Sequence, residues 1–142
     1  MRDERREPRN AVEQVVRGEH RRIGGQFVDV ARAFEQPDER DALREAFTAL
    51  CEQLDVHFEQ EERLYYASIG ALRPDVAPEI RAISSAHAHF RLQLAAIADQ
   101  LRRGEIRAAH QGFSTLAADF HQHEALEEKL LQRIDPKRDS TP

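Results

Sequence analysis

Apolar residues recur at alternating steps of three and four along four long segments of the chain, and no segment alternates as a strand does. The short stretches between these segments carry the prolines and glycines that end helices. The pattern predicts helices over about residues 10–34, 38–68, 78–103 and 105–134. Long helices with short connections pack as antiparallel neighbours. We therefore predict an all-α fold, an antiparallel up-down-up-down four-helix bundle.

Residues that stop or start helices set the predicted boundaries. Pro37 ends the first helix because proline restricts the residue before it. Asp38 is the predicted N-cap of the second helix, which ends near Gly70. Pro78 suits the first turn of the third helix, where its missing N–H costs nothing, and Gly104 closes that helix.

Chain length and end composition predict the domain organisation. A chain of 142 residues is long enough for one core and too short for two. Residues 1–9 mix arginines with acids, which indicates a solvated, disordered N-terminal arm. Residues 10–134 form the predicted bundle, and 135–142 a C-terminal tail.

Charge and composition exclude several classes of partner. A net charge of −5 argues against a nucleic-acid partner, and no run approaches the roughly 20 apolar residues that a membrane span needs. The opening segment has no apolar stretch typical of a secretory signal. One cysteine, Cys51, excludes an internal disulfide framework and fits a reducing compartment. We expect a cytoplasmic protein.

Six ionisable residues occupy positions that the helical pattern reserves for the core. They are His20, His57, Glu61, His87, His123 and Glu127. Residues four apart lie on one helix face, so each His-x-x-x-Glu pair can converge on one point. Burying an unpaired imidazole or carboxylate costs several kcal/mol, and a metal centre supplies the missing partners. A hydrogen-bonded core histidine or acid is the ordinary explanation of one such residue, but a poor explanation of six.

The spacing of these residues divides the chain into two similar helix pairs. Each pair provides a histidine and then, after a nearly equal interval, His-x-x-x-Glu. This symmetry predicts two metal ions, each with two imidazoles, bridged by two carboxylates. Imidazole and carboxylate without thiolate favour Fe or Mn and remain compatible with Zn, Ni or Cu.

Three further histidines are left out of the predicted centre. His89 is two residues from His87, about 200° around the helix, so both cannot face the core. His121 fails the same test against His123. His110 falls above the predicted ligand layer and is interpreted as a flanking polar residue.

With His20, His57-Phe-Glu-Gln-Glu61, His87 and His123-Glu-Ala-Leu-Glu127, residues 10–134 resemble the hemerythrin-like, or HHE cation-binding, domains. The resemblance implies a non-heme di-iron centre bridged by the two glutamates, with Zn or Mn as other possible metals. It also implies an open coordination site for a small diatomic ligand such as O₂. The expected function is binding or sensing O₂ or a related molecule, or handling iron.

Three residues near the predicted centre have open interpretations. Arg91 stands where oxygen-carrying hemerythrins have a second histidine of the third helix, so an iron there can take water, an exogenous ligand or another side chain. Tyr65 lies one turn after Glu61, so its phenol either reaches the centre as a donor or ligand or points to solvent. Gly24, one turn after His20, gives room for a ligand, close backbone approach or tight helix packing.

Other functions of the same fold stay open. Ferritin-like di-iron proteins use Glu-x-x-His, and no histidine here has an acid three residues before it. A redox enzyme acting on peroxide or NO is the first alternative, although no further acid, base or substrate pocket is visible. A metal-dependent regulatory module that contacts an unknown protein partner is the second.

Overall fold

The computed structural model describes residues 11–36 and 38–133 and is helical almost throughout. Its elements are α2 (Ala11–Phe34), α3 (Arg40–Gln60), the π-helical segment η1 (Glu61–Tyr66), α4 (Ala67–Leu72), the 3₁₀ turn η2 (Pro74–Val76), α5 (Ala77–Arg102) and α6 (Ile106–Arg133). The described residues contain no strand. The predicted all-α bundle is confirmed. The predicted N-terminal arm and C-terminal tail lie outside the described residues.

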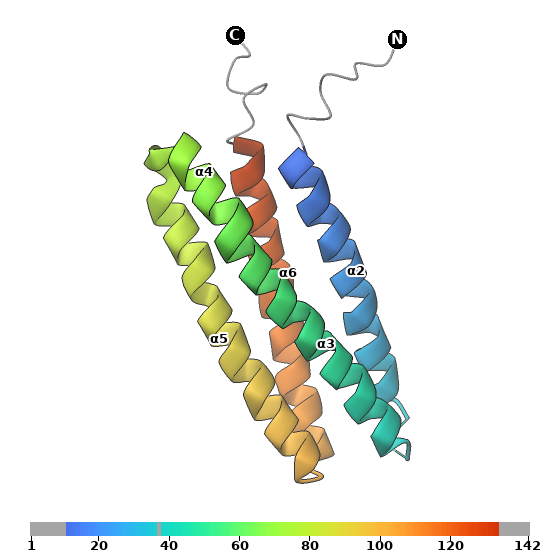
Figure 1. Cartoon of the computed structure of the whole chain (residues 1–142). Helices are drawn as coiled ribbons and strands as arrows, with labels where there is room; N and C mark the ends of the chain where they lie inside the picture. The colour runs from blue at the N-terminus through green and yellow to red at the C-terminus, as the bar shows by residue number, and fades with distance from the viewer. Residues whose placement is uncertain (1–10, 37, 134–142) are drawn as a thin grey trace, which may run out of the picture.

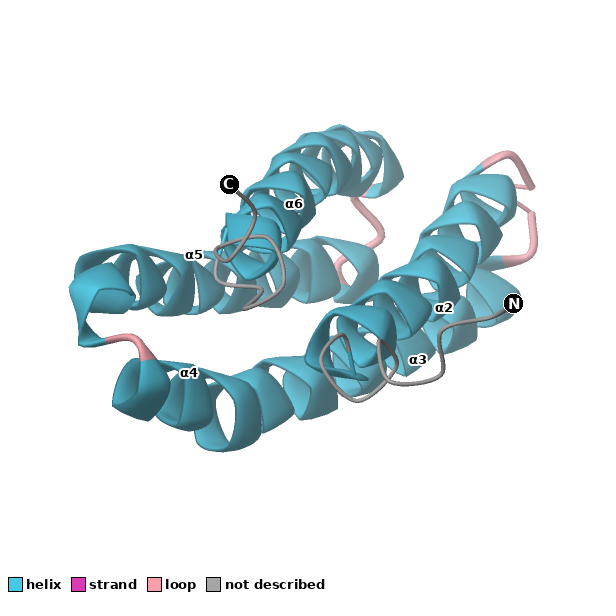
Figure 2. Ribbon diagram, turned by 90° about the horizontal axis from the view of Figure 1, so that it is seen from above, coloured by secondary structure: helices cyan, strands magenta, loops and turns pink. Residues whose placement is uncertain are grey.

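The long helices form a closed arrangement of four. The α2–α3 and α5–α6 connections lie at one end of the bundle and the α4–α5 connection at the other, so consecutive helices run in opposite directions (Figure 1). Helix α2 packs on α3 and α6, and α5 packs on the same two helices. Seen along the bundle, α3 continues through η1 into α4 as one rod (Figure 2). The second predicted helix is therefore three consecutive helical segments.

Two apolar clusters fill the interior. The larger takes its side chains from the half of the bundle near the α2–α3 and α5–α6 connections and includes Ile23, Leu54, Phe58, Phe90 and Phe120. The smaller lies toward the α4–α5 end and is made of Val16, Tyr66, Ile69, Val76, Ile80, Ile83, Leu130 and Leu131. Apart from His57, which stands next to Phe58 of the larger cluster, the predicted ligands fall between the residues of these two clusters along their helices. The polar layer thus separates two hydrophobic cores.

The predicted N-cap of the second helix is wrong, and the helix runs two residues past its predicted end near Gly70. Asp38 is not its N-cap, because the Glu39 N–H donates to the Gln36 carbonyl and closes a turn that contains Asp38. The helix begins at Arg40, without a side-chain cap. It also continues through Gly70 to Leu72, where the Arg73 N–H bonds to the Ile69 carbonyl.

The predicted end of the third helix and the predicted place of Pro78 are confirmed. Gly104 follows α5 with a φ of 75°, its N–H donates to the Leu101 carbonyl, and the Glu105 N–H donates to the Gln100 carbonyl. This pair of bonds is the Schellman motif, which favours glycine at the left-handed position. Pro78 lies in the first turn of α5.

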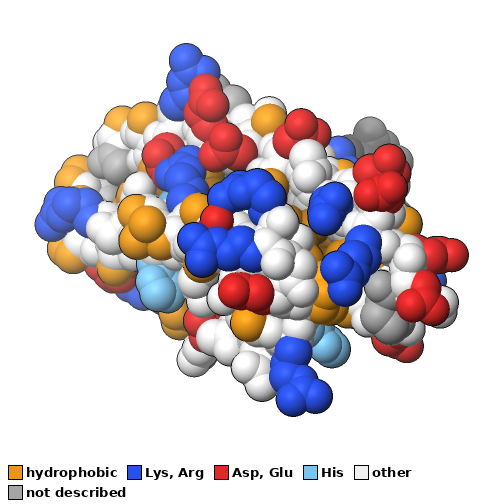
Figure 3. All heavy atoms as spheres, turned by 90° about the horizontal axis from the view of Figure 1, so that it is seen from below, with side chains coloured by type: hydrophobic (Ala, Val, Ile, Leu, Met, Phe, Trp, Pro, Cys, Tyr) orange, Lys and Arg blue, Asp and Glu red, His pale blue; other side chains and the backbone are white. Residues whose placement is uncertain are grey.

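Charges of both signs lie on the surface of the bundle (Figure 3). On the face drawn in Figure 3, basic and acidic side chains are interspersed, so that face carries no continuous basic surface. None of the helices in residues 11–36 and 38–133 is long and apolar enough to cross a membrane.

Gly24 and Gly104 should respond oppositely to alanine. A Cβ at Gly24 meets no heavy atom within 4 Å, so the close-approach and tight-packing interpretations of this glycine are wrong. Gly24→Ala should raise the free energy of unfolding by up to about 1 kcal/mol through helix propensity. Gly104→Ala should lower it by about 1 kcal/mol, because alanine is strained at positive φ. Denaturant unfolding of the metal-free protein measures both free-energy changes. Changes of the same sign in the two variants would contradict the different roles assigned to the two glycines.

Candidate metal centre

All six predicted ligands lie in one buried layer, each no more than 6% exposed. They come from every long helix: His20 from α2, His57 from α3, Glu61 from the start of η1, His87 from α5, and His123 and Glu127 from α6. The layer forms because each residue continues the inward stripe of its own helix. Segments far apart in the sequence therefore place ionisable atoms at one depth of the bundle.

The six side chains form two groups that share one carboxylate. His20, His57, Glu61 and Glu127 offer ligand atoms within 4.8 Å of one another, and Glu61 does the same with His87 and His123. The first group has four possible ligands and the second has three. Each contains two imidazoles, as the symmetry of the helix pairs predicted.

The two inner carboxylates have different partners. Glu61 Oε2 lies 3.1 Å from His57 Nε2, and Glu61 Oε1 lies 3.2 Å from His87 Nε2. Glu127 Oε1 lies 2.9 Å from His20 Nε2, whereas its Oε2 accepts a 2.7 Å hydrogen bond from the Tyr66 hydroxyl. Glu61 therefore has the arrangement that a bridging carboxylate needs, whereas Glu127 belongs to the first group only.

A second ring of carboxylates orients three of the imidazoles through their Nδ1 atoms. The pairs are His20 with Glu128 at 2.8 Å, His57 with Glu19 at 2.9 Å and His87 with Glu62 at 2.7 Å. An Nδ1–H bond to a carboxylate fixes ring orientation and leaves Nε2 to bind a metal. No carboxylate pairs with His123 Nδ1 in the described part of the chain.

Sequence reasoning missed these three outer glutamates. Each one is the chain neighbour of a predicted ligand, but it serves a histidine of another helix: Glu19 beside His20 bonds His57, Glu62 beside Glu61 bonds His87, and Glu128 beside Glu127 bonds His20. In the sequence, an acid at the edge of the inward-facing stripe of a helix cannot be told from an acid that faces solvent. The only available signal was adjacency to a ligand.

The wider winding of η1 brings an unexpected phenol to the layer. Tyr66 is 7% exposed, and its hydroxyl donates to Glu127 Oε2 at 2.7 Å and to Glu61 Oε1 at 3.2 Å. Because a π-helix pairs residue i with i+5, Tyr66 follows Glu61 on the inward face. The sequence argument assumed α-helical spacing and selected Tyr65, whose side chain lies outside the described residues.

Arg91 does not enter the centre. Its guanidinium lies 5.3 Å from the centre of the Phe58 ring, and its Nε lies 3.2 Å from Asp55 Oδ1. Its Nη1 is 3.8 Å from Glu62 Oε2, the atom that bonds His87. Arg91, on α5, therefore lies at the surface beside the outer carboxylate of His87.

Burial and charge set the protonation of the four histidines. Burial lowers the pKa of His57 and of His87, and it lowers the pKa of His123 to about 4. Burial also acts to lower the pKa of His20, but hydrogen bonds with Glu127 and Glu128 raise it to about 9. Three imidazoles are therefore neutral near pH 7, the form that binds metals.

The pKa values of the two inner carboxylates, Glu61 and Glu127, shift in opposite directions. Burial and the facing Glu127 carboxylate raise the pKa of Glu61. Burial acts in the same direction on Glu127, but hydrogen bonds from Glu61, His20 and Tyr66 lower its pKa overall. Without a cation the pair holds one proton, because two buried anions this close repel each other.

Three buried atoms test whether a cation fits. Glu61 Oε2, His87 Nε2 and His123 Nε2 have no hydrogen-bond partner. Buried polar atoms in proteins normally have a hydrogen-bond partner, so three buried atoms without one, all in the same layer, need an explanation. Nitrogen and oxygen donors of this kind suit a transition-metal cation. The side chains present therefore fit a metal centre.

The histidines excluded from the predicted centre lie on the surface. His89, His110 and His121 are exposed, and the His110 ring stacks on Phe34 with centroids 4.7 Å apart. Their positions show that the periodicity argument separated inward from outward histidines.

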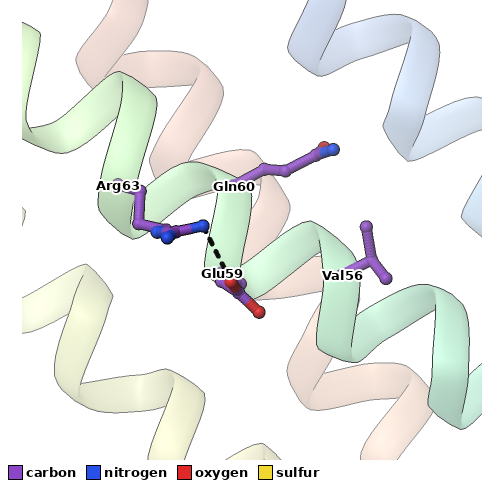
Figure 4. Close-up of a pocket in the computed structure, with 4 residues that line it drawn as sticks. All are labelled: Val56, Glu59, Gln60 and Arg63. Atoms are coloured by element: carbon purple, nitrogen blue, oxygen red, sulfur yellow. Dashed lines mark hydrogen bonds and ion pairs between the residues drawn. The ribbon is translucent and has the colours of Figure 1, made fainter.

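Two surface hollows differ in their relation to the layer. A groove of about 300 Å³ between α5 and α6 is lined by Ala82, Ile83, Ala86, His89, Phe90, Asp119, Gln122, His123 and Leu126. A hollow of about 420 Å³ on α3 and η1 is lined by Val56, Glu59, Gln60 and Arg63, with a Glu59–Arg63 ion pair at its edge (Figure 4). Only the first has a residue of the candidate centre on its wall.

Comparison with known proteins gives one match. The family model described as the hemerythrin HHE cation binding domain matches residues 12–134, a range that contains every residue of the two groups. No curated protein and no solved structure matches the chain.

Proposed function

The chain belongs to the hemerythrin HHE cation-binding domain family, and from this we propose that its buried layer binds two iron ions and that the iron pair binds or senses O₂ or a related small molecule. One observation carries the proposal: two groups of ligand atoms share Glu61. A shared carboxylate between two imidazole pairs is a site for two adjacent cations. Bound iron would supply reversible redox chemistry and an open coordination position.

The donor set supports iron over softer metals. The two groups offer imidazole nitrogens and carboxylate oxygens and no thiolate. Burial and nearby Asp55 raise the pKa of Cys51 to about 11, so this thiol is a poor metal ligand at neutral pH. Zn and Mn accept the same donors, so direct metal analysis decides among the three.

The second group supports a small external ligand. Its three side chains, like the four of the first group, leave open coordination positions on a non-heme iron. Its His123 lies on the wall of the α5–α6 groove, whose other walls include Ile83, Phe90 and Leu126. A narrow, mainly apolar approach favours a small uncharged molecule over a large or ionic one.

The proposal is tested by loading the full chain with Fe(II) without air. Two iron ions per chain and an absorption spectrum that changes reversibly with O₂ are the expected result. The matched control is His57→Ala, which removes a ligand of one ion and should lower the iron content and abolish the reversible spectral change of the pair. Sustained turnover of peroxide or NO would favour the enzyme instead. Stoichiometric binding of another metal, or of none, would reject the iron centre.

A further inference from the structure

The two ligand groups are equivalent except at one position. His20 and His57 are joined by both inner carboxylates, whereas His87 and His123 are joined by Glu61 alone. Glu127 nevertheless turns one oxygen, Oε2, away from His20, and that oxygen meets the Tyr66 hydroxyl at 2.7 Å. A phenol therefore bonds the Glu127 oxygen that faces away from His20.

The contacts of Tyr66 place its hydroxyl on the His87 side of the layer. The hydroxyl is 3.2 Å from Glu61 Oε1, and that same oxygen is 3.2 Å from His87 Nε2. The Tyr66 and His87 rings are stacked, with centroids 5.9 Å apart and an angle of 25° between their planes. The phenol oxygen thus lies beside the atoms that would bind the second cation.

We propose that Tyr66 is a direct ligand, through its phenolate oxygen, of the ion held by Glu61, His87 and His123. The proposal rests on the iron-binding function proposed above and adds a ligand to that site. As the ion binds, the phenol O–H bond breaks, the oxygen donates an electron pair to the ion, and the proton leaves to solvent. No oxidant or reductant is consumed.

The local helix geometry is what makes this ligation possible. In an uninterrupted α-helix the residue one turn after Glu61 would be Tyr65. The single π-helical turn Glu61–Tyr66 instead aligns Tyr66 with Glu61 on the inward face. Such turns are rare and are frequently found at functional sites. Here the turn places the Tyr66 hydroxyl against Glu61 and Glu127.

The charge of the second group favours an anionic donor. Without Tyr66 it offers one carboxylate and two imidazoles. Fe(III) is a hard cation that prefers anionic oxygen, and tyrosine is a known protein ligand of ferric iron. Phenolate ligation would add one negative charge and make the ferric form of this ion the more stable one.

The chain has two tyrosines, which makes a spectroscopic test decisive. A phenolate bound to Fe(III) gives a visible charge-transfer band, and resonance Raman excitation in that band shows tyrosinate ring modes. The expected result for the Fe(III)-loaded full chain is both signals. They should persist in Tyr65→Phe, where Tyr66 is the remaining tyrosine, and disappear in Tyr66→Phe. The second ion should also bind at least about tenfold more weakly in Tyr66→Phe.

The possible outcomes separate this proposal from the one it rests on. Wild-type protein with two iron ions per chain but no tyrosinate modes would overturn Tyr66 ligation and leave the di-iron function intact. Loss of the modes in Tyr65→Phe would overturn it equally. A protein that binds no iron would reject both. The Tyr65→Phe measurement does not require Tyr66→Phe to fold, so a misfolded variant leaves the test conclusive.

Discussion

Glu61→Ala is expected to reduce the iron content from two ions per chain to nearly none. The carboxylate is 0% exposed, and its two oxygens lie near His57 and His87, which belong to different ligand groups. Removing it takes a ligand from both ions at once, whereas His123→Ala takes one from a single ion. Replacing a residue that only orients a metal ligand already lowers metal affinity by about 10–100-fold. Replacing a ligand shared by two ions should therefore lower it further.

Metal analysis after gel filtration measures this effect, and two further variants make it specific. Glu61→Gln keeps the side-chain volume, so loss of iron in this variant is attributable to the missing charge. Glu59→Ala, on the same helix and paired with Arg63 at the surface, should keep both ions. His89→Ala and His121→Ala should keep them as well, because both side chains are exposed. Full iron occupancy in Glu61→Ala would contradict the bridging assignment.

Removal of the metal is expected to cause the largest change in thermal stability. A ligand present at 1,000 times its dissociation constant stabilises the folded state by about 4 kcal/mol, so two ions contribute about 8 kcal/mol. For a domain of this size that corresponds to a fall in Tm of about 20 °C on chelation. The loss falls on the layer between the two apolar clusters, where Glu61, His87 and His123 have orphaned buried atoms.

Calorimetric unfolding with and without chelator checks this expectation. Glu61→Ala is the appropriate control, because it takes a ligand from both ions, and a chain that cannot hold them should have a low Tm that chelator no longer changes. A wild-type Tm that is insensitive to chelation would mean that the layer is stable by its own hydrogen bonds. The protonated His20 bonded to Glu127 would then be its principal stabilising contact.

The sequence predicted the helices and the inner ligands for the same physical reason. Burial in a bundle imposes a period, so a histidine such as His57 among Leu50, Leu54 and Phe58 stands out as polar in an apolar position. The role of Gly104 was predictable because the left-handed backbone conformation that ends a helix strongly favours glycine. Asp38 was misassigned because a turn that begins at Gln36 takes it out of the helix, and composition does not reveal that turn.

The outer parts of the centre were not predictable by the same reasoning. Glu19, Glu62 and Glu128 lie at the edges of their helical stripes, where a carboxylate is ordinarily solvated, and their role appears only once helices are packed together. Tyr66 was missed because the argument assumed a constant 3.6 residues per turn. A change of winding inside a helix leaves no mark in a periodicity count unless the residues on both sides are compared.

The π-helical turn carries one residue more than an α-helical turn, and this sets how residue number relates to facing along the α3–η1–α4 rod. The inward positions before Glu61 and those after Tyr66 belong to two registers offset by one residue. Deleting a single residue between them would bring Tyr66 to α-helical spacing from Glu61, so a regular helix would still place Tyr66, Ile69 and the later inward side chains on the interior face. When related sequences are aligned, a one-residue gap at this place is therefore compatible with an unchanged centre.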